Sequence, residues 1–302
     1  MIRPRTIALA LALSLLPAAA AAAPLLGPSA LAPQAQRALS ASIRADRAAH
    51  PEHFARVHNL IGLQGRFYRT TRARTPEVTQ ELRALGADAL LPMLDALAFS
   101  DYPRALSPEE REALEVGVLN ALSALRDRRA EPVLRAAFER LSAPESVRAA
   151  ARALGSLAGD GEVAALTAAA RQAGPRQAAA LEGLGVTRRA DAARVIAEVL
   201  DASSDVAAIT GAARGLAEAG STWAAAADGH TVALPPTVAT SLVRAFVRVP
   251  AARDELMVPI AATATRDTLT AVEAEIARGA ADATTARNLA TLHRIVRRSL
   301  AR

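Results

Sequence analysis

A leucine that recurs about every thirty residues constrains the fold of this chain more than any other feature. It closes a short alanine-rich segment at Leu85, Leu125, Leu157, Leu184 and Leu216, with spacings of 40, 32, 27 and 32 residues. The insertion SDYPRALSPEE, residues 100–110, accounts for the long first interval. A period near 30 with two helices per unit is typical of a helical solenoid.

The unit around residue 150 shows the pattern of a helix pair. One stripe at helical spacing comprises Val147, Ala150, Ala151, Leu154 and Leu157, and a second comprises Val163, Leu166 and Ala170. Pro144 suits the first turn of the first helix, and Asp160 is expected to be the N-cap of the second. Because an alanine-rich hairpin buries little apolar area alone, such pairs must stack on their neighbours.

These residues resemble a HEAT-like repeat. The segment VRAAARALGSLAGDGEVAALTAAAR has the small-residue first helix, an L-G-x-L-x-x-D turn and a second helix that opens on small aliphatic residues. RDRRAEPVLRAAFERL is similar, and the resemblance covers about residues 76–265. It implies an all-α, right-handed α-solenoid that serves as a binding scaffold, and it supplies no catalytic residues.

The composition agrees with an all-α chain. Hydrophobic residues make up 51% and aromatic residues only 3%, and helix formers dominate over β-branched residues. All 36 basic residues are arginine, and the formal net charge is +6. This excess is mild and does not by itself indicate a polyanion partner.

The N-terminus predicts export. A short basic region, residues 1–5, precedes the apolar run TIALALALSLL, Pro17, and small residues suited to cleavage, which together indicate a signal peptide over residues 1–23. The alternative, an uncleaved anchor, is disfavoured because the run is shorter than a bilayer span. No transmembrane segment is expected after signal removal, and the location is expected to be periplasmic or secreted.

Beyond the signal peptide, four regions are expected. They are a flexible Pro/Ala-rich tether at 24–36, an N-terminal helical cap region at 37–75, the repeat solenoid at 76–266 and C-terminal capping helices at 267–302. Within the cap region, one helix is expected from Pro51 to Leu63. Terminal units that differ from the interior are expected of solenoids.

Catalytic and cofactor motifs are not found. Gly159, Gly161 and Ala164 fit G-x-G-x-x-A, but a dinucleotide turn must follow a strand, so this is expected to be a helix–helix turn. The chain has no G-x-S-x-G and no H-E-x-x-H, and without lysine or cysteine a P-loop, a thiol nucleophile and a disulfide are excluded. We therefore expect no enzyme, no cofactor and no nucleic-acid partner.

Histidine clustering does not predict a metal site. His50, His53 and His58 lie close in sequence, but on one continuous helix they point in different directions. The i, i+4 pairing of known helical metal sites is absent. No metal is expected from the sequence.

Two segments depart from the repeat and supply the candidate partner contacts, Arg66, Phe67, Tyr68, Arg69, Arg72, Arg74, Trp223 and His230. The first segment holds four arginines and two aromatic residues in nine positions, and interfaces concentrate their binding energy in Tyr, Trp and Arg. The structural alternative is that its aromatic residues plug the end of the solenoid and that Trp223 is a packing residue.

Two functions remain open at this level. The first is an exported, non-enzymatic scaffold that binds a protein or peptide partner on a helical-repeat surface. The alternative is a binder of anionic envelope components, glycan or lipid headgroups, through arginine-rich patches at 66–74 and at the C-terminus, where Arg294, Arg297, Arg298 and Arg302 lie.

Overall fold

The computed structural model describes residues 24–67, 76–101, 106–220 and 232–301, and within them every regular element is a helix. The α-helices are α1 (Pro33–Ala49), α2 (Pro51–Phe67), α3 (Glu77–Ala84), α4 (Leu90–Ala98), α5 (Pro108–Leu125), α6 (Glu131–Arg140), α7 (Pro144–Ser156), α8 (Asp160–Ala170), α9 (Gln177–Val186), α10 (Ala190–Ala202), α11 (Val206–Ala219), α13 (Pro236–Arg248), α14 (Arg253–Ala262), α15 (Arg266–Arg278) and α16 (Ala283–Leu300). Short 3₁₀ turns are η1 (Pro28–Ala30), η2 (Gly86–Ala89), η3 (Arg128–Ala130) and η4 (Pro250–Ala252). The all-α prediction is confirmed.

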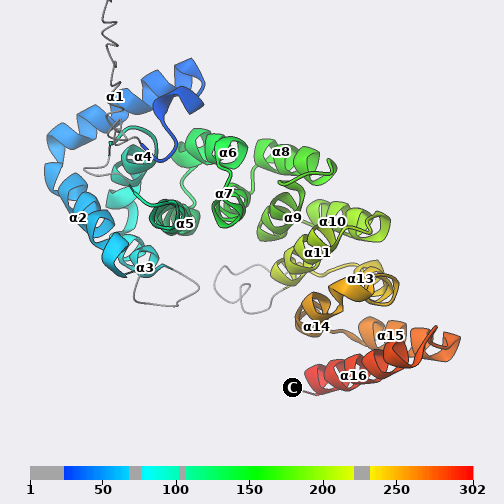
Figure 1. Ribbon diagram of the computed structural model, residues 1–302. Helices are drawn as coiled ribbons and strands as arrows, with labels where there is room; N and C mark the ends of the chain where they lie inside the picture. Colours follow the sequence, from blue (N-terminus) through cyan, green and yellow to red (C-terminus); the bar gives the residue numbers. More distant parts are fainter. Residues whose placement is uncertain (1–23, 68–75, 102–105, 221–231, 302) are drawn as a thin grey trace, which may run out of the picture.

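From α3 onward the helices alternate between two layers (Figure 1). The inner layer consists of α3, α5, α7, α9, α11, α14 and α16, each of which contacts the next. The outer layer consists of α4, α6, α8, α10, α13 and α15, and the inner layer follows the concave side of the curved array. These sequential contacts are compatible with a helical repeat.

The turn that follows α7 is a helix–helix turn, as predicted. α7 begins at Pro144 and ends at Ser156, and α8 begins at Asp160, so no strand precedes the glycines. The expectation that Asp160 caps α8 is wrong, because Gly159 occupies the N-cap and Asp160 is the first helical residue. The Asp160 carboxylate instead forms an ion pair of 2.7 Å with Arg189, in the next turn of the array.

Main-chain contacts between helices bring the inner layer together. A Cβ atom added to Gly155 of α7 would lie 2.1 Å from the carbonyl oxygen of Gly183 in α9. One added to Gly215 of α11 would lie 2.3 Å from the carbonyl oxygen of Leu181, also in α9. Because only glycine permits this approach, α7, α9 and α11 are spaced more closely than ordinary side chains would allow.

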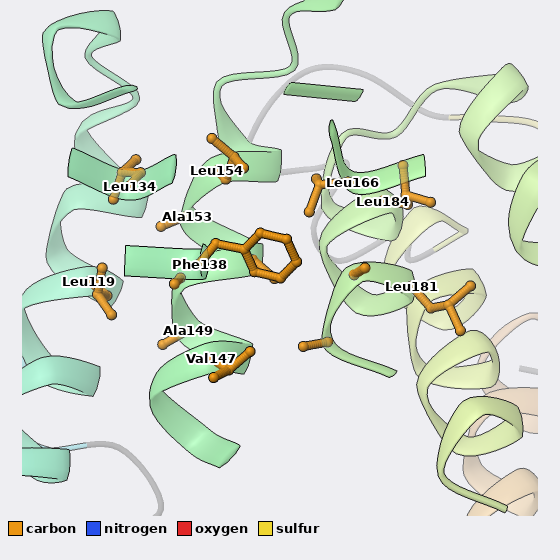
Figure 2. Close-up of a cluster of buried hydrophobic side chains, with 14 of the residues drawn as sticks. Leu119, Leu134, Phe138, Val147, Ala149, Ala153, Leu154, Leu166, Leu181 and Leu184 are labelled. Carbon is orange, nitrogen blue, oxygen red and sulfur yellow. The ribbon is translucent and has the colours of Figure 1, made fainter. Parts of the chain in front are cut away.

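Larger side chains fill the space between the layers (Figure 2). Phe138 of α6 lies at the centre of this cluster, with Leu154 of α7 and Leu166 of α8 around it. Glycine allows close spacing within the inner layer, and α5, α7, α9 and α11 contact one another more extensively than the outer helices beside them do, so the array curves toward its inner side. The concave face therefore follows from residue size.

The N-terminal segment is attached to the array, whereas a flexible tether was expected at 24–36. Leu25 and Leu31 are buried, and the backbone N–H of Leu26 donates a 2.8 Å hydrogen bond to the carbonyl oxygen of Leu97. The Arg111 guanidinium donates to the carbonyl oxygens of Pro24 and Leu25. The leucines of this proline-rich segment pack on the apolar surface at the N-terminal end of the array. Their burial fixes a segment whose composition suggested a tether.

Other helix predictions are confirmed. The helix expected from Pro51 to Leu63 is α2, which continues to Phe67, and the C-terminal helices expected at 267–302 are α15 and α16. None of the described helices has the length and apolar character needed to span a bilayer. The predicted signal peptide lies outside the described residues.

Candidate functional site

An open groove of about 450 Å³ crosses the inner layer. It spans five successive inner helices, from α3 to α11, and therefore collects side chains from positions that are far apart in sequence. Its lining consists of Thr79, Arg83, Asn120, Ser123, Ala124, Arg126, Arg152, Ser156, Val186, Arg188 and Glu218. We call this the basic groove.

Positive charges outnumber negative charges in the described lining of the basic groove. Four arginines line the groove, and Glu218 is the one acidic residue among the described lining residues. The Glu218 carboxylate bridges two of these arginines, at 3.3 Å from Arg152 and 3.7 Å from Arg188. The described lining therefore carries a formal excess of three positive charges.

Two of the arginines occupy an unusual backbone conformation. Arg126 follows α5 and Arg188 follows α9, with φ angles of 53° and 50°, and Ala158 holds the corresponding position after α7 with φ 53°. Glycine is the usual residue at such a left-handed helix end, and any other residue costs about 1 kcal/mol there. Arginine thus stands where glycine would be more stable, and backbone strain of this kind is concentrated at functional sites.

The neutral lining residues are short and polar. Thr79, Asn120, Ser123 and Ser156 offer hydroxyl and amide groups beside the guanidinium groups. Two of the hydroxyls are already engaged, since Ser156 donates to the carbonyl oxygen of Ala153 at 2.7 Å and Thr79 donates to that of Gly117 at 3.4 Å. The described lining therefore combines guanidinium groups with short polar side chains, a set of donors suited to anion recognition.

A row of ion pairs, separate from the basic groove, connects neighbouring inner helices. Glu182 of α9 is buried, and its carboxylate lies 3.2 Å from Arg148 of α7 and 3.6 Å from Arg214 of α11. Arg214 continues the row with a 2.7 Å pair to Glu255 of α14. Burial raises the pKa of Glu182, and its arginine neighbours offset only part of this shift.

A smaller cluster lies at the N-terminal end, in a cleft of about 500 Å³ between α1, α2 and α4. At its base Asp95 is buried and accepts hydrogen bonds from Arg47 and Ser100, with the His58 Nε2 atom at 3.5 Å. Burial alone would raise the pKa of Asp95, but His58, Ser100 and Arg47 together hold it below its usual range. Arg47 belongs to α1 and His58 to α2, so their shared contact with the Asp95 carboxylate connects both helices to α4.

The residues predicted as partner contacts lie outside the part of the chain whose side chains the structure describes. Arg66 and Phe67 belong to the last turn of α2, and their side chains are outside the described set. Tyr68, Arg69, Arg72, Arg74, Trp223 and His230 lie outside the described residues. Those contacts therefore remain predictions.

The histidine geometry differs from the one assumed above. His50 is not on a continuous helix with His53, because α1 ends at Ala49 and α2 begins at Pro51, with His50 between them at φ −136°. Among the described residues, His50, Glu52 and His53 are the one group of three whose potential metal-ligating atoms lie within 4.8 Å of one another.

Comparison with protein-family models and with curated proteins finds no match to this chain.

Proposed function

We propose that this protein is an exported, non-enzymatic scaffold of the HEAT-like, right-handed solenoid class, and that it binds an acidic segment of a partner protein in the basic groove. The observation that supports this proposal is the gathering of four arginines and one carboxylate from five successive inner helices. The sequence features in favour of export are the basic residues and apolar run of residues 1–23.

The chemistry of arginine favours carboxylates as the ligand groups. A guanidinium group offers paired N–H donors that match the two oxygens of a carboxylate, and these charge-assisted bonds are stronger than neutral ones. A bound carboxylate would replace Glu218 as the partner of Arg152 and Arg188. The open shape of the groove suits a chain that lies across it, and an extended peptide of five residues would reach about 17 Å at 3.3–3.6 Å per residue.

Helix ends limit the range of this positive field. Arg126, Ser156 and Val186 lie at the C-terminal ends of inner helices, where backbone carbonyls carry partial negative charge. The arginines are thus partly balanced by the helices beneath them. Short-range pairing with discrete carboxylates is favoured over long-range attraction of a polyanion.

The test measures binding of a fluorescein-labelled decapeptide that alternates Glu and Ser, with a Gln/Ser peptide of equal length as the neutral control. Arg126→Gly removes one charge and relieves the left-handed strain, so the fold should be retained while affinity falls about tenfold, as expected for one lost charge-assisted contact. Ala158→Gly is the matched control, because it makes the same backbone change without altering charge. It should leave affinity unchanged.

The outcomes separate the competing functions. Saturable binding of the acidic peptide that weakens in Arg126→Gly and not in Ala158→Gly supports the proposal. Equal binding of the Gln/Ser peptide, or equal affinity for both variants, overturns it. Preference for a sulfated glycan or for phosphatidylglycerol vesicles over the peptide would instead favour the alternative function, the binding of anionic envelope components.

A further inference from the structure

We propose that the junction between α1 and α2 binds a transition-metal ion of the Zn²⁺ class through His50, Glu52 and His53. This site lies on the N-terminal hairpin and is separate from the basic groove, so it does not depend on the proposed function. Its basis is the placement of three metal-ligating side chains around one point.

The break between the two helices brings the donors together. Because His50 precedes a proline, its backbone leaves the helical region, and its ring folds back beside that of His53. The two imidazole rings are stacked, with centroids 5.2 Å apart and planes 17° from parallel.

The donor distances match a metal site better than a set of hydrogen bonds. The Glu52 Oε1 atom lies 3.8 Å from His50 Nδ1 and 3.7 Å from His53 Nε2, which is too long for hydrogen bonding. A tetrahedral zinc ion with bonds of about 2.0–2.1 Å separates its ligand atoms by about 3.4 Å. Side-chain rotations that shorten these two separations by a few tenths of an ångström, and that bring the imidazole nitrogens together from within 4.8 Å, would close this set around one ion.

The ligand types and the surroundings select the class of ion. Two imidazoles and one carboxylate suit Zn²⁺, Cu²⁺ or Ni²⁺, whereas Ca²⁺ and Mg²⁺ prefer sites built wholly from oxygen. The last carbonyls of α1 favour a cation, which offsets the unfavourable field at the start of α2. The side chains of His50 and Glu52 are 52% and 62% exposed, so an ion has free access and keeps water in its remaining position.

The experiment is calorimetric titration of the untagged protein with Zn²⁺ at pH 7.5, repeated with Ca²⁺. The chain has no cysteine, so no thiolate competes for the ion. We expect one saturable Zn²⁺ equivalent, at least about tenfold weaker in His50→Ala and in His53→Ala, since each removes one of three protein ligands. Binding should also weaken at pH 5, because a protonated imidazole does not bind metal.

His293→Ala is the matched control variant. His293 lies 3.2 Å from Glu273, so it offers a histidine–carboxylate pair without a third ligand, and its removal should leave Zn²⁺ affinity unchanged. A Zn²⁺ affinity unaltered in both junction variants would overturn the proposal. So would the absence of saturable Zn²⁺ binding up to 1 mM, or tighter binding of Ca²⁺ than of Zn²⁺. Circular dichroism of each variant establishes that any loss of binding is not a loss of fold.

Discussion

Replacement of Gly215 by alanine tests whether main-chain contact sets the spacing of the inner layer. Gly215 lies in the interior of α11, and an added Cβ would stand 2.3 Å from the Leu181 carbonyl oxygen, where ordinary contact begins near 3.4 Å. It would also meet the Cδ1 atom of Ile196 at 3.3 Å. Since the nearest obstacle is helix backbone and not a side chain that can rotate, α9 and α11 must separate by about 1 Å.

Two opposing terms decide the sign of the effect. Alanine is favoured over glycine in a helix interior by about 1 kcal/mol. Overpacking typically costs about 1–3 kcal/mol, and a clash between two backbones belongs at the upper end of that range. The expected net loss is therefore about 2 kcal/mol, equivalent to a fall in Tm of about 4–8 °C for a chain of this size.

The assay is urea and thermal unfolding followed by far-ultraviolet circular dichroism, with Gly62→Ala as the control. Gly62 lies in α2, and an added Cβ there would meet no atom within 4 Å, so this variant should be stabilised by up to about 1 kcal/mol. If Gly215→Ala is as stable as Gly62→Ala, the close approach of α9 and α11 does not exist and the explanation of curvature fails.

Three further predictions concern charged residues. Asp95→Asn should destabilise the protein by about 2–3 kcal/mol at pH 7, and because the folded pKa of Asp95 is depressed, the deficit should shrink in unfolding measurements as pH falls through that pKa. Glu182→Gln should match or exceed the wild type in stability at pH 7. Because the folded pKa of Glu182 is raised, the wild-type protein gains stability as the pH falls from above that pKa toward 4.5. The difference in stability between the variant and the wild type should therefore disappear near pH 4.5. Glu218→Gln should tighten binding of the Glu/Ser peptide several-fold in fluorescence anisotropy, because it removes the carboxylate that competes for two groove arginines, whereas a purely structural Glu218 would give weaker binding.

The helices were predictable because their signals are local. The stripe through Val147 and Leu154 needs only one helical period to be recognised, and both residues are buried as expected. Pro144 marks the start of α7 by the same kind of local rule. The turn at Gly159 was also predictable, since the residues before it carry a helical pattern.

The errors arose where a distant residue decided the outcome. Asp160 pairs with Arg189, from the following turn, and no local pattern shows that partner. Leu25 and Leu31 are buried on the array although their neighbours suggest a tether. The separation of His50 from α2 has a local signal in Pro51, the residue with which the expected helix also begins.

The groove was beyond prediction from sequence. Its successive arginines lie 26 to 43 residues apart in sequence, and they share a face only because four inner helices stack in register. A partial signal exists in the turns, since Arg126 and Arg188 both stand just beyond the end of an inner helix.

The glycine contacts of the inner layer also bear on how a partner can be accommodated. Where helices touch through side chains, new rotamers can widen or narrow the surface they share. Where α7, α9 and α11 touch through backbone, at Gly155 and Gly215, changes of rotamer cannot alter the spacing of the helices. The surface of these helices then has fixed dimensions, and a partner must change its own conformation to fit it. An acidic segment without structure of its own meets this requirement, at an ordering cost of about 1–2 kcal/mol per residue fixed. Such complexes form with modest affinity and release readily.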